Sequence, residues 1–226
     1  MQCEGIVGWD ARDAAVVTDW VDWHRAYDDP TSSLARRLDV VRRRLGEALD
    51  LVPAQRPRVL SLCAGDGRDV IPVLAGRAAS RRVTAVLVEQ DEVLARRAAD
   101  AAAAAGLDGL EVRSGDAGDP RVFDDVLPVD VLMLCGILGN IEHARVANVV
   151  VSVARILVLG GFINWTRGGS EPDLRPQVRD WFQSAGFDEV AFDGAPEPYG
   201  VGLNRLADTS ATDPRTLPQP LFTFVR

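Results

Sequence analysis

A glycine-rich turn, CAGDGRD at Cys63–Asp69, directly follows the apolar run VLSL and precedes a helical pattern. Gly65 and Gly67 let the backbone turn sharply and approach a ligand without a β-carbon in the way, and the next helix begins with unpaired N–H groups. Glu89 ends the run VLVE about twenty residues later, a position from which an acid can bind both hydroxyls of a ribose. Together these residues predict a site for a ribose-containing ligand.

A third acid follows the next apolar run, in the tetrapeptide SGDA at Ser114–Ala117. Asp116 at this position can accept a hydrogen bond from the exocyclic amine of an adenine. The alternative is that Asp116 caps the helix that follows, as short polar side chains often do. The sequence leaves both roles open.

These residues can form one site only if the strands that precede them end at the same edge of a sheet. Short apolar runs without strict alternation predict strands buried on both faces, at Arg58–Cys63, Val83–Glu89, Leu110–Ser114, Val129–Cys135 and Gly161–Trp165. Helical patterns alternate with them, at Asp69–Arg77, Asp91–Ala105, Ala144–Leu159 and Asp173–Ala185. The alternation predicts a doubly wound α/β fold with a parallel sheet. Two further strands are predicted at Phe187–Phe192 and Leu221–Val225, separated by a long polar loop over Gly194–Pro220.

Two helices are predicted before the first strand. Residues 10–28 carry an aromatic stripe at helical spacing that ends at Tyr27, and a second helix follows the hydroxyl caps at Thr31–Ser33. We therefore expect a single domain, with residues 1–52 as an N-terminal helical cap and residues 58–226 as the α/β core.

Composition restricts the classes of partner. The net charge of −8 disfavours nucleic acid, and a cluster of arginines around Arg36–Arg44 is interpreted as a solvated helix face. All 25 basic residues are arginine, which excludes lysine chemistry such as Schiff bases. Three widely spaced cysteines and two histidines predict no metal site. With no run long enough to cross a bilayer and no signal-peptide pattern, we expect a cytoplasmic protein without a membrane span.

With these motifs in place, the chain resembles the class I methyltransferases that depend on S-adenosylmethionine (SAM). The resemblance rests on VLSLCAGDGRD, Glu89, GDA at Gly115–Ala117 and DVLMLCGILGN at Asp130–Asn140. It implies a seven-stranded, mostly parallel sheet with an antiparallel last strand, and SAM as cofactor with S-adenosylhomocysteine as product. The residues that it implies for cofactor binding are Ala64, Gly65, Asp66, Gly67, Asp69, Glu89, Gln90, Asp116, Ala117, Cys135 and Gly136.

The chain departs from the family pattern at two positions. Ser61 stands where the family usually has an acid that helps to hold the methionine end of the cofactor, and Cys63 stands where it often has a glycine. Asp66 or Asp69 is expected to replace the missing acid, with Asp69 favoured because it lies in the first helical turn. Cys63 is interpreted as a packing residue.

The acceptor is predicted to be a small molecule with an attacking oxygen or nitrogen. Methyl transfer from a sulfonium is a direct displacement, so the protein mainly has to align donor and acceptor. A hydroxyl acceptor needs a base, and His143 is the candidate. The predicted acceptor contacts are His24, Tyr27, Asn140, Trp165, Arg167, Tyr199, Asn204 and Arg205. An arginine pair suits an acceptor carboxylate, with an ordinary ion pair as the alternative.

Three other functions stay open. An NAD(P)-dependent oxidoreductase also uses a glycine turn and a strand-end acid, although its GxGxxG pattern fails here at Cys63 and Arg68. A SAM-binding protein without methyltransferase activity is compatible with Ser61. A methyltransferase acting on protein or RNA is disfavoured by the acidity of the chain. The sequence is compatible with a monomer or a homodimer.

Overall fold

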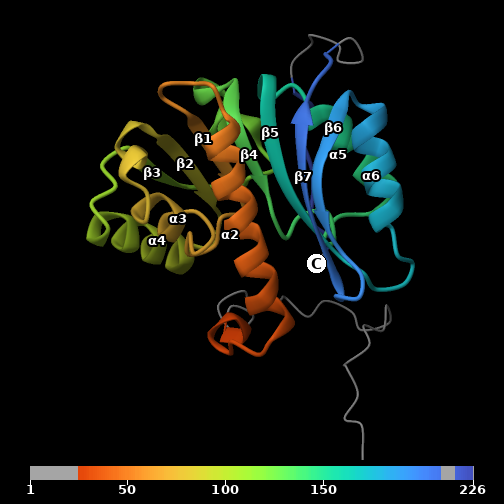
Figure 1. Cartoon of the computed structure of the whole chain (residues 1–226), viewed down its shortest axis with the longest axis horizontal. Coiled ribbons are helices and arrows are strands. Elements are labelled where there is room, and N and C mark those ends of the chain that lie inside the picture. The colour runs from red at the N-terminus through yellow and green to blue at the C-terminus, as the bar shows by residue number, and fades with distance from the viewer. Residues whose placement is uncertain (1–24, 210–216, 226) are drawn as a thin grey trace, which may run out of the picture.

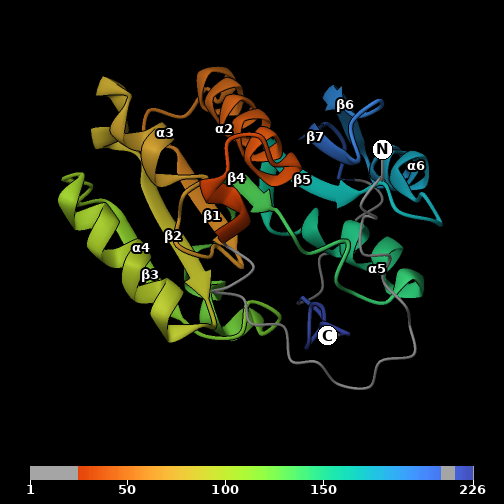
Figure 2. The same ribbon diagram turned by 90° about the horizontal axis from the view of Figure 1, so that it is seen from below.

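The computed structural model describes residues 25–209 and 217–225. One seven-stranded sheet has the order β3-β2-β1-β4-β5-β7-β6 and carries helices on both faces (Figures 1 and 2). The strands are β1 Arg58–Leu62, β2 Thr84–Glu89, β3 Leu110–Ser114, β4 Val129–Leu134, β5 Leu157–Gly168, β6 Phe187–Asp193 and β7 Tyr199–Leu206. β1 to β5 pair in parallel, whereas β7 runs antiparallel between β5 and β6. The predicted fold class is confirmed.

The helices follow the strands in the predicted alternation. They are α2 Ser33–Leu51, α3 Ile71–Ala75, α4 Glu92–Ala104, α5 His143–Val153 and α6 Arg175–Ser184, with short 3₁₀ turns at η1 Arg25–Asp28, η2 Ala78–Arg82, η3 Pro120–Val122 and η4 Asp124–Val126. No helix in the described ranges is long and apolar enough to cross a membrane.

Alternate residues of the central strands supply two separate cores. Leu60 and Leu132 face the core that α5 and α6 cover, whereas Val59 and Val131 face the core that α2, α3 and α4 cover. The strands are apolar on both sides because each side packs against helices, which explains why their sequences do not alternate.

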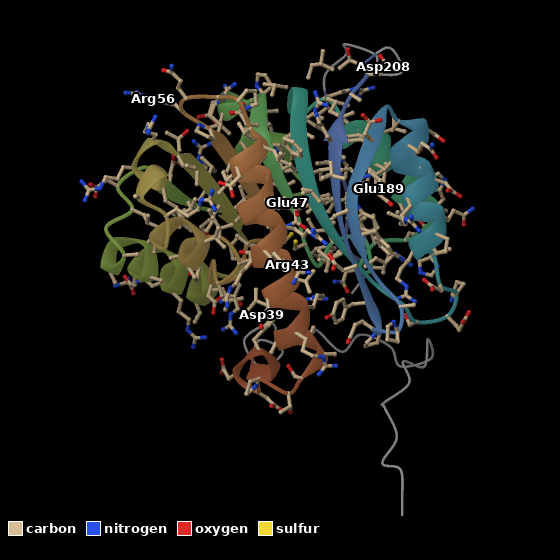
Figure 3. The ribbon with its side chains drawn as sticks, viewed as in Figure 1. Asp39, Arg43, Glu47, Arg56, Glu189 and Asp208 are labelled. Atoms are coloured by element: carbon tan, nitrogen blue, oxygen red, sulfur yellow. The ribbon has the colours of Figure 1, made fainter. Side chains whose placement is uncertain are left out.

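Helix α2 begins where its sequence predicts. The Ser32 hydroxyl accepts a hydrogen bond from the Ala35 N–H at 3.0 Å and caps the helix. On its inner face, the Val41 carbonyl accepts a hydrogen bond from the buried Asn164 amide of β5 at 2.9 Å. On its outer side, Arg44 binds the Asp193 carboxylate of β6 at 2.7 Å. The helix is thus fixed onto the sheet, with Asp39, Arg43 and Glu47 along its outward face (Figure 3).

The interpretation of the arginine cluster as a solvated face was wrong in part. Arg43 shares the Asp193 carboxylate with Arg44, at 2.9 Å, and Arg36 lies 3.4 Å from Glu197. These arginines join α2 to the last two strands. The helix predicted over residues 10–28 lies outside the described residues except for η1.

The prediction of the last strand was wrong. Leu221–Val225 forms only a single bridge, between Phe224 and Ile141, and the last strand is β7, inside the segment predicted as a loop. Packing requires glycine at two positions of β7. A β-carbon at Gly202 would collide with the Trp165 indole, and one at Gly200 would contact the Phe192 ring too closely. In this strand the glycines make room for aromatic rings rather than for a turn.

The helix predicted over Ala144–Leu159 was too long, because α5 ends at Val153 and β5 begins at Leu157. The run from Val149 to Leu159 is apolar and rich in β-branched residues, a composition that periodicity alone cannot divide between helix and strand. The other predicted elements agree with the structure to within a few residues at their ends.

Candidate functional site

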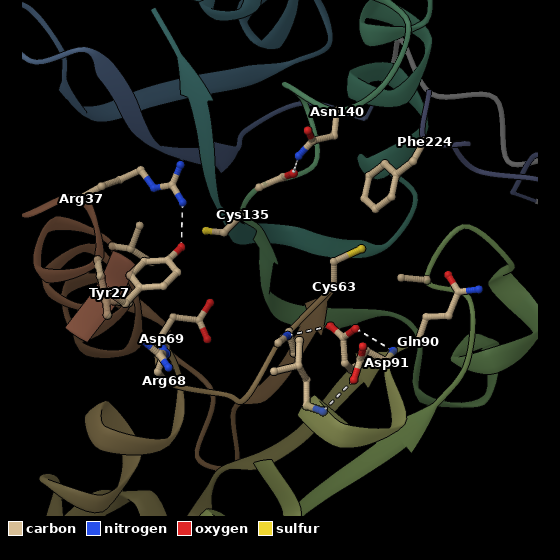
Figure 4. Close-up of a pocket in the computed structure, with 18 of the residues that line it drawn as sticks. Tyr27, Arg37, Cys63, Arg68, Asp69, Gln90, Asp91, Cys135, Asn140 and Phe224 are labelled. Atoms are coloured by element: carbon tan, nitrogen blue, oxygen red, sulfur yellow. Dashed lines mark hydrogen bonds between the residues drawn. The ribbon is translucent and has the colours of Figure 1, made fainter. Parts of the chain in front are cut away.

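A cavity of about 310 Å³ lies at the carboxyl ends of β1 to β4, beneath η1 and α2 (Figure 4). It brings together the predicted residues Ala64, Gly65, Asp69, Glu89, Gln90, Asp116, Ala117, Cys135, Gly136, Tyr27 and Asn140. Its size lies at the lower end of the range for small-molecule sites, about 300–1,000 Å³. The turns that follow consecutive strands therefore meet in one concave site, as open α/β sheets do where they bind ligands.

The turn after β1 adopts left-handed backbone at three positions, with φ of 55° at Cys63, 58° at Gly65 and 72° at Gly67. A β-carbon at Gly67 would lie 2.6 Å from the Ile71 side chain, so this glycine serves helix packing and does not line the cavity. Cys63 holds the left-handed conformation without being glycine, and its side chain lines the cavity. Burial raises the pKa of its thiol.

Glu89 joins two of the turns. One carboxylate oxygen accepts the Gly65 N–H at 2.7 Å, and the other accepts the Asp91 N–H at 2.9 Å. Each carboxylate oxygen can accept a second hydrogen bond, and the side chain lines the cavity although it is only 9% exposed. Backbone donors therefore hold this acid in position for further donors such as ligand hydroxyls.

Asp69 is different, because its Oδ1 atom is buried and receives no hydrogen bond from the described part of the chain. Burial raises the pKa of Asp69 to about 6; the Asp66 charge raises it further, whereas backbone hydrogen bonds from the Asp69 and Val70 N–H groups and the Arg42 charge lower it. A buried carboxylate with one oxygen left without a donor is destabilised in its ionised form. Since Asp69 lines the cavity, a cationic or hydrogen-bond-donating ligand group would complete its interactions.

Tyr27 and Arg37 lie at the same end of the cavity as Asp69 (Figure 4). Arg37 donates a hydrogen bond to the Tyr27 hydroxyl at 2.8 Å, and the Arg68 guanidinium lies 4.8 Å from the centre of the Tyr27 ring. Burial raises the pKa of Tyr27, Arg37 lowers it and the Asp69 charge raises it. An anionic and a cationic side chain thus face the same end of the cavity.

The opposite end contains Gln90 and Phe224 (Figure 4), and Asp116, which follows β3, also lines the cavity. Asp116 accepts the Gly118 N–H at 2.8 Å. The residue that caps η3 is Asp119, whose carboxylate accepts the Arg121 N–H, so the alternative role of Asp116 as a helix cap was wrong. The Asp116 side chain lines the cavity instead.

The turn after β4 forms a third wall of the cavity. Gly136 has a φ of 75° and donates its N–H to the Thr166 hydroxyl at 2.8 Å. Asn140 donates from its amide to the Gly136 carbonyl at 2.5 Å. The buried Arg167 guanidinium donates to the Leu138 carbonyl. These bonds hold the turn in place, and Arg167 acts on it from outside the cavity.

Several predicted site residues do not line the cavity. Trp165 and Asn204 are fully buried on β5 and β7, where the indole N–H donates to the Asn204 amide oxygen at 2.7 Å. Tyr199 packs in the core beneath α2, and Arg205 is exposed. Tyr199, Asn204 and Arg205 were assigned to a long loop but belong to β7, an internal strand.

Two further predicted residues do not line the cavity, and a third cannot be placed relative to it. The Asp66 carboxylate is bound by Arg68 at 2.8 Å and does not line the cavity. His143 is the exposed first residue of α5 and does not line it either. His24 lies outside the described residues. The described residues also contain no group of His, Cys, Asp and Glu placed to hold a metal ion.

The structure adds cavity residues that the sequence did not single out for a site. Those without a predicted binding role are Arg37, Leu38, Val41, Cys63, Arg68, Asp91, Leu94 and Phe224. Arg37 belongs to the arginine cluster but lies three residues after Leu34 and four before Val41, at the spacing of the apolar stripe of α2, and this spacing could have separated it from the exposed Arg36 and Arg43. Phe224 reaches the cavity through a tertiary contact with the turn after β4.

No family model matches the chain, and no curated protein matches it in sequence. An O-methyltransferase family 2 protein from Planctomyces limnophilus, in complex with apigenin, is 20% identical; the match covers 76% of this chain and 59% of that chain, with a TM-score of 0.56. RosA from Streptomyces davawensis, an N,N-8-amino-8-demethyl-D-riboflavin dimethyltransferase, is 21% identical, with 83% and 59% covered and a TM-score of 0.54. A Bordetella parapertussis protein described as a possible exported protein is 18% identical, with 76% and 68% covered and a TM-score of 0.60.

At these identities the likeness concerns the fold. The chain shares its fold with several proteins described as methyltransferases, in agreement with the fold that the resemblance implied. The chain spans 59% of the length of each of the two methyltransferases named above.

Proposed function

We propose that this protein binds SAM in the cavity and transfers its methyl group to a small-molecule acceptor. The observation that carries the proposal is the pair of opposite charges at one end of the cavity, where Asp69 has a buried oxygen without a donor and Arg37 presents a guanidinium. A zwitterionic α-amino acid group complements both charges. SAM combines such a group with a ribose and an adenine.

At the amino-acid end, the Asp69 carboxylate would accept hydrogen bonds from the ammonium group, and Arg37 would bind the carboxylate. Asp69 thereby takes the part of the acid that the family usually has at the position of Ser61. Ser61 itself is 1% exposed within β1 and does not line the cavity, so the acid has to come from the following turn.

At the nucleoside end, Glu89 would accept from the ribose hydroxyls and Asp116 from the adenine amine. Both side chains line the cavity, and both are oriented by backbone N–H groups, from Gly65 and Gly118 respectively. Such fixed acceptors lose little conformational entropy when a ligand binds.

When bound, SAM supplies an activated methyl group on a sulfonium. The chain contributes position: the turn after β4, held through Gly136 and Asn140, forms the wall between the two ends of the cavity. Alignment of donor and acceptor accounts for a large part of the rate in such displacements. Of the two histidines, His143 does not line the cavity and His24 lies outside the described residues, so the proposal includes no histidine base.

The small-molecule acceptor is supported by the structural neighbours. One was solved with the flavonoid apigenin, and another is a dimethyltransferase of an aminoriboflavin. The alternative of an NAD(P)-dependent oxidoreductase is disfavoured by charge, because Asp66 and Asp69 occupy the turn that would meet a dinucleotide pyrophosphate.

Calorimetric titration of the full chain with SAM, S-adenosylhomocysteine and NADH tests the proposal. We expect micromolar binding of SAM and S-adenosylhomocysteine and no binding of NADH. Binding of NADH alone, or of none of the three, would overturn the cofactor assignment. Radiolabelled methyl transfer to a panel of phenols, amines and carboxylic acids then tests the activity, and SAM binding without turnover on any of them would favour a SAM-binding protein that does not methylate.

A further inference from the structure

The C-terminal segment 217–225 crosses the nucleoside end of the cavity. The Leu221 N–H donates to the Gly118 carbonyl at 2.7 Å, and the Val225 N–H donates to the Asn140 carbonyl at 3.0 Å. The first bond holds the segment to the turn after β3, and the second holds it to the turn after β4. The segment therefore connects two of the walls that form the site.

The contact with the turn after β3 is close. A β-carbon at Gly118 would collide with the Phe222 carbonyl oxygen, so the glycine is required for the segment to pass this near. Gly118 comes directly after Asp116 and Ala117, both of which line the cavity. The path of the C-terminal segment is thus set by the same turn that is proposed to bind adenine.

From Phe222 to Val225 the side chains of this segment alternate between buried or half-buried and exposed positions. Phe222 is 6% exposed and packs in the core with Leu221. Thr223 and Val225 are exposed, whereas Phe224 is half-buried and lines the cavity. The Phe222 and Phe224 rings lie 5.6 Å apart. Phe222 fills the core, and the ring of Phe224 faces the site, as Figure 4 shows.

We propose that Phe224 forms the apolar wall of a nucleobase pocket and packs against the adenine of the bound cofactor. The inference rests on the proposed function. Polar groups such as Asp116 and Gln90 can bind the edge of a base, but its faces require apolar or aromatic partners. Among the described residues that line the cavity, the aromatic ones are Tyr27 and Phe224, and Tyr27 lies at the amino-acid end.

The test separates the two ends of the cavity by using two ligands. S-adenosylhomocysteine spans both ends, whereas 5′-methylthioadenosine has the adenine and ribose but no amino-acid group. Phe224→Ala is expected to weaken both ligands about tenfold, measured by calorimetric titration of the full chain. Asp69→Asn is expected to weaken S-adenosylhomocysteine only. Val225→Ala, at an exposed neighbouring side chain, is the matched control and should bind both ligands like the parent.

The outcomes distinguish this inference from the proposed function. If the parent protein binds neither ligand, the proposed function fails. If the parent binds both and Phe224→Ala binds them equally well, the inference is overturned while the proposed function stands. Thermal unfolding identifies a variant that has lost its fold. In that case Phe224→Leu, which keeps apolar volume without the ring, should weaken both ligands about threefold, and unchanged affinity in this variant also overturns the inference.

Discussion

The acidic side chains at the two ends of the cavity differ in how many hydrogen bonds they already accept from the protein. At the nucleoside end, the Glu89 carboxylate is already held by two backbone N–H groups, and Asp116 is held by a third. At the amino-acid end, Asp69 keeps a buried oxygen without a donor. One end is preorganised before ligand binds, and the other is completed only by the ligand, so they should respond differently to substitution and to pH.

Glu89→Ala should produce the largest loss, because this carboxylate joins the turns after β1 and β2 as well as facing the ligand. We expect S-adenosylhomocysteine and 5′-methylthioadenosine to bind about 100-fold more weakly in calorimetric titrations, since charge-assisted bonds are lost. Glu92→Ala, at an exposed side chain of α4, is the control. Unchanged affinity in the Glu89 variant would remove the ribose assignment.

Asp69→Asn should act at one end only. Loss of the negative charge opposite an ammonium is expected to weaken S-adenosylhomocysteine about 30-fold and to leave 5′-methylthioadenosine unchanged, in the same titrations. Asp108→Asn, at an exposed position, provides the matched substitution. An equal loss for both ligands would mean that the variant has disturbed the whole cavity, and the contrast between the ends would disappear.

Arg37→Ala tests the cationic partner at the same end. The guanidinium also donates a hydrogen bond to the Tyr27 hydroxyl and is partly exposed to water, so its removal should reduce affinity less than Asp69→Asn does. We expect S-adenosylhomocysteine to bind about fivefold more weakly and 5′-methylthioadenosine to bind as before. Arg36→Ala, one residue earlier on the exposed side of α2, should bind both ligands normally. If both variants behave alike, Arg37 has no specific part in binding.

The pH dependence should show the smallest effect. Burial raises the pKa of Asp69 to about 6, so the acid that the ammonium requires becomes protonated as the pH falls through this value. Titrations from pH 8 to pH 5.5 should weaken S-adenosylhomocysteine a few-fold in the parent protein but not in Asp69→Asn. An equal decline in both proteins would assign the effect to another group.

The same pKa fixes the sign of a stability change. Folded Asp69 holds its proton more tightly than the unfolded chain does, where the pKa is about 3.9. Its contribution to the free energy of unfolding therefore decreases as the pH rises from about 4 through 6. The ligand ammonium would offset this loss, so binding and stability are linked at Asp69.

The nucleoside end could be predicted largely from the sequence. The glycine turn, Glu89 and Asp116 follow one another at short spacings, each at the end of a strand or within two residues after it. Because parallel strands place their carboxyl ends at one edge, local patterns were enough to bring these residues together. The preference for Asp69 over Asp66 also agrees with the geometry, since Asp69 lines the cavity whereas Asp66 binds Arg68.

Of the predicted acceptor contacts, Tyr27 and Asn140 line the cavity, whereas those on β5 and β7 do not. Asn204 and Tyr199 were assigned to a loop because their segment contains glycines and polar residues, yet they lie in an internal strand. The glycines face the rings of Trp165 and Phe192, which come from other strands. The requirement for glycine at these positions comes from residues distant in sequence, so the neighbouring residues alone do not predict it.

The sequence by itself determined the alternation of the first five strands with helices and the position of the turns that line the cavity, because these depend on periodicity and on residues close together in the chain. Only the tertiary structure decided that Arg37 reaches the cavity, that the Asp69 Oδ1 atom lacks a donor, and that Phe224 reaches the site from the C-terminal segment. Each of these depends on how segments distant in sequence pack against one another, which a local pattern does not encode.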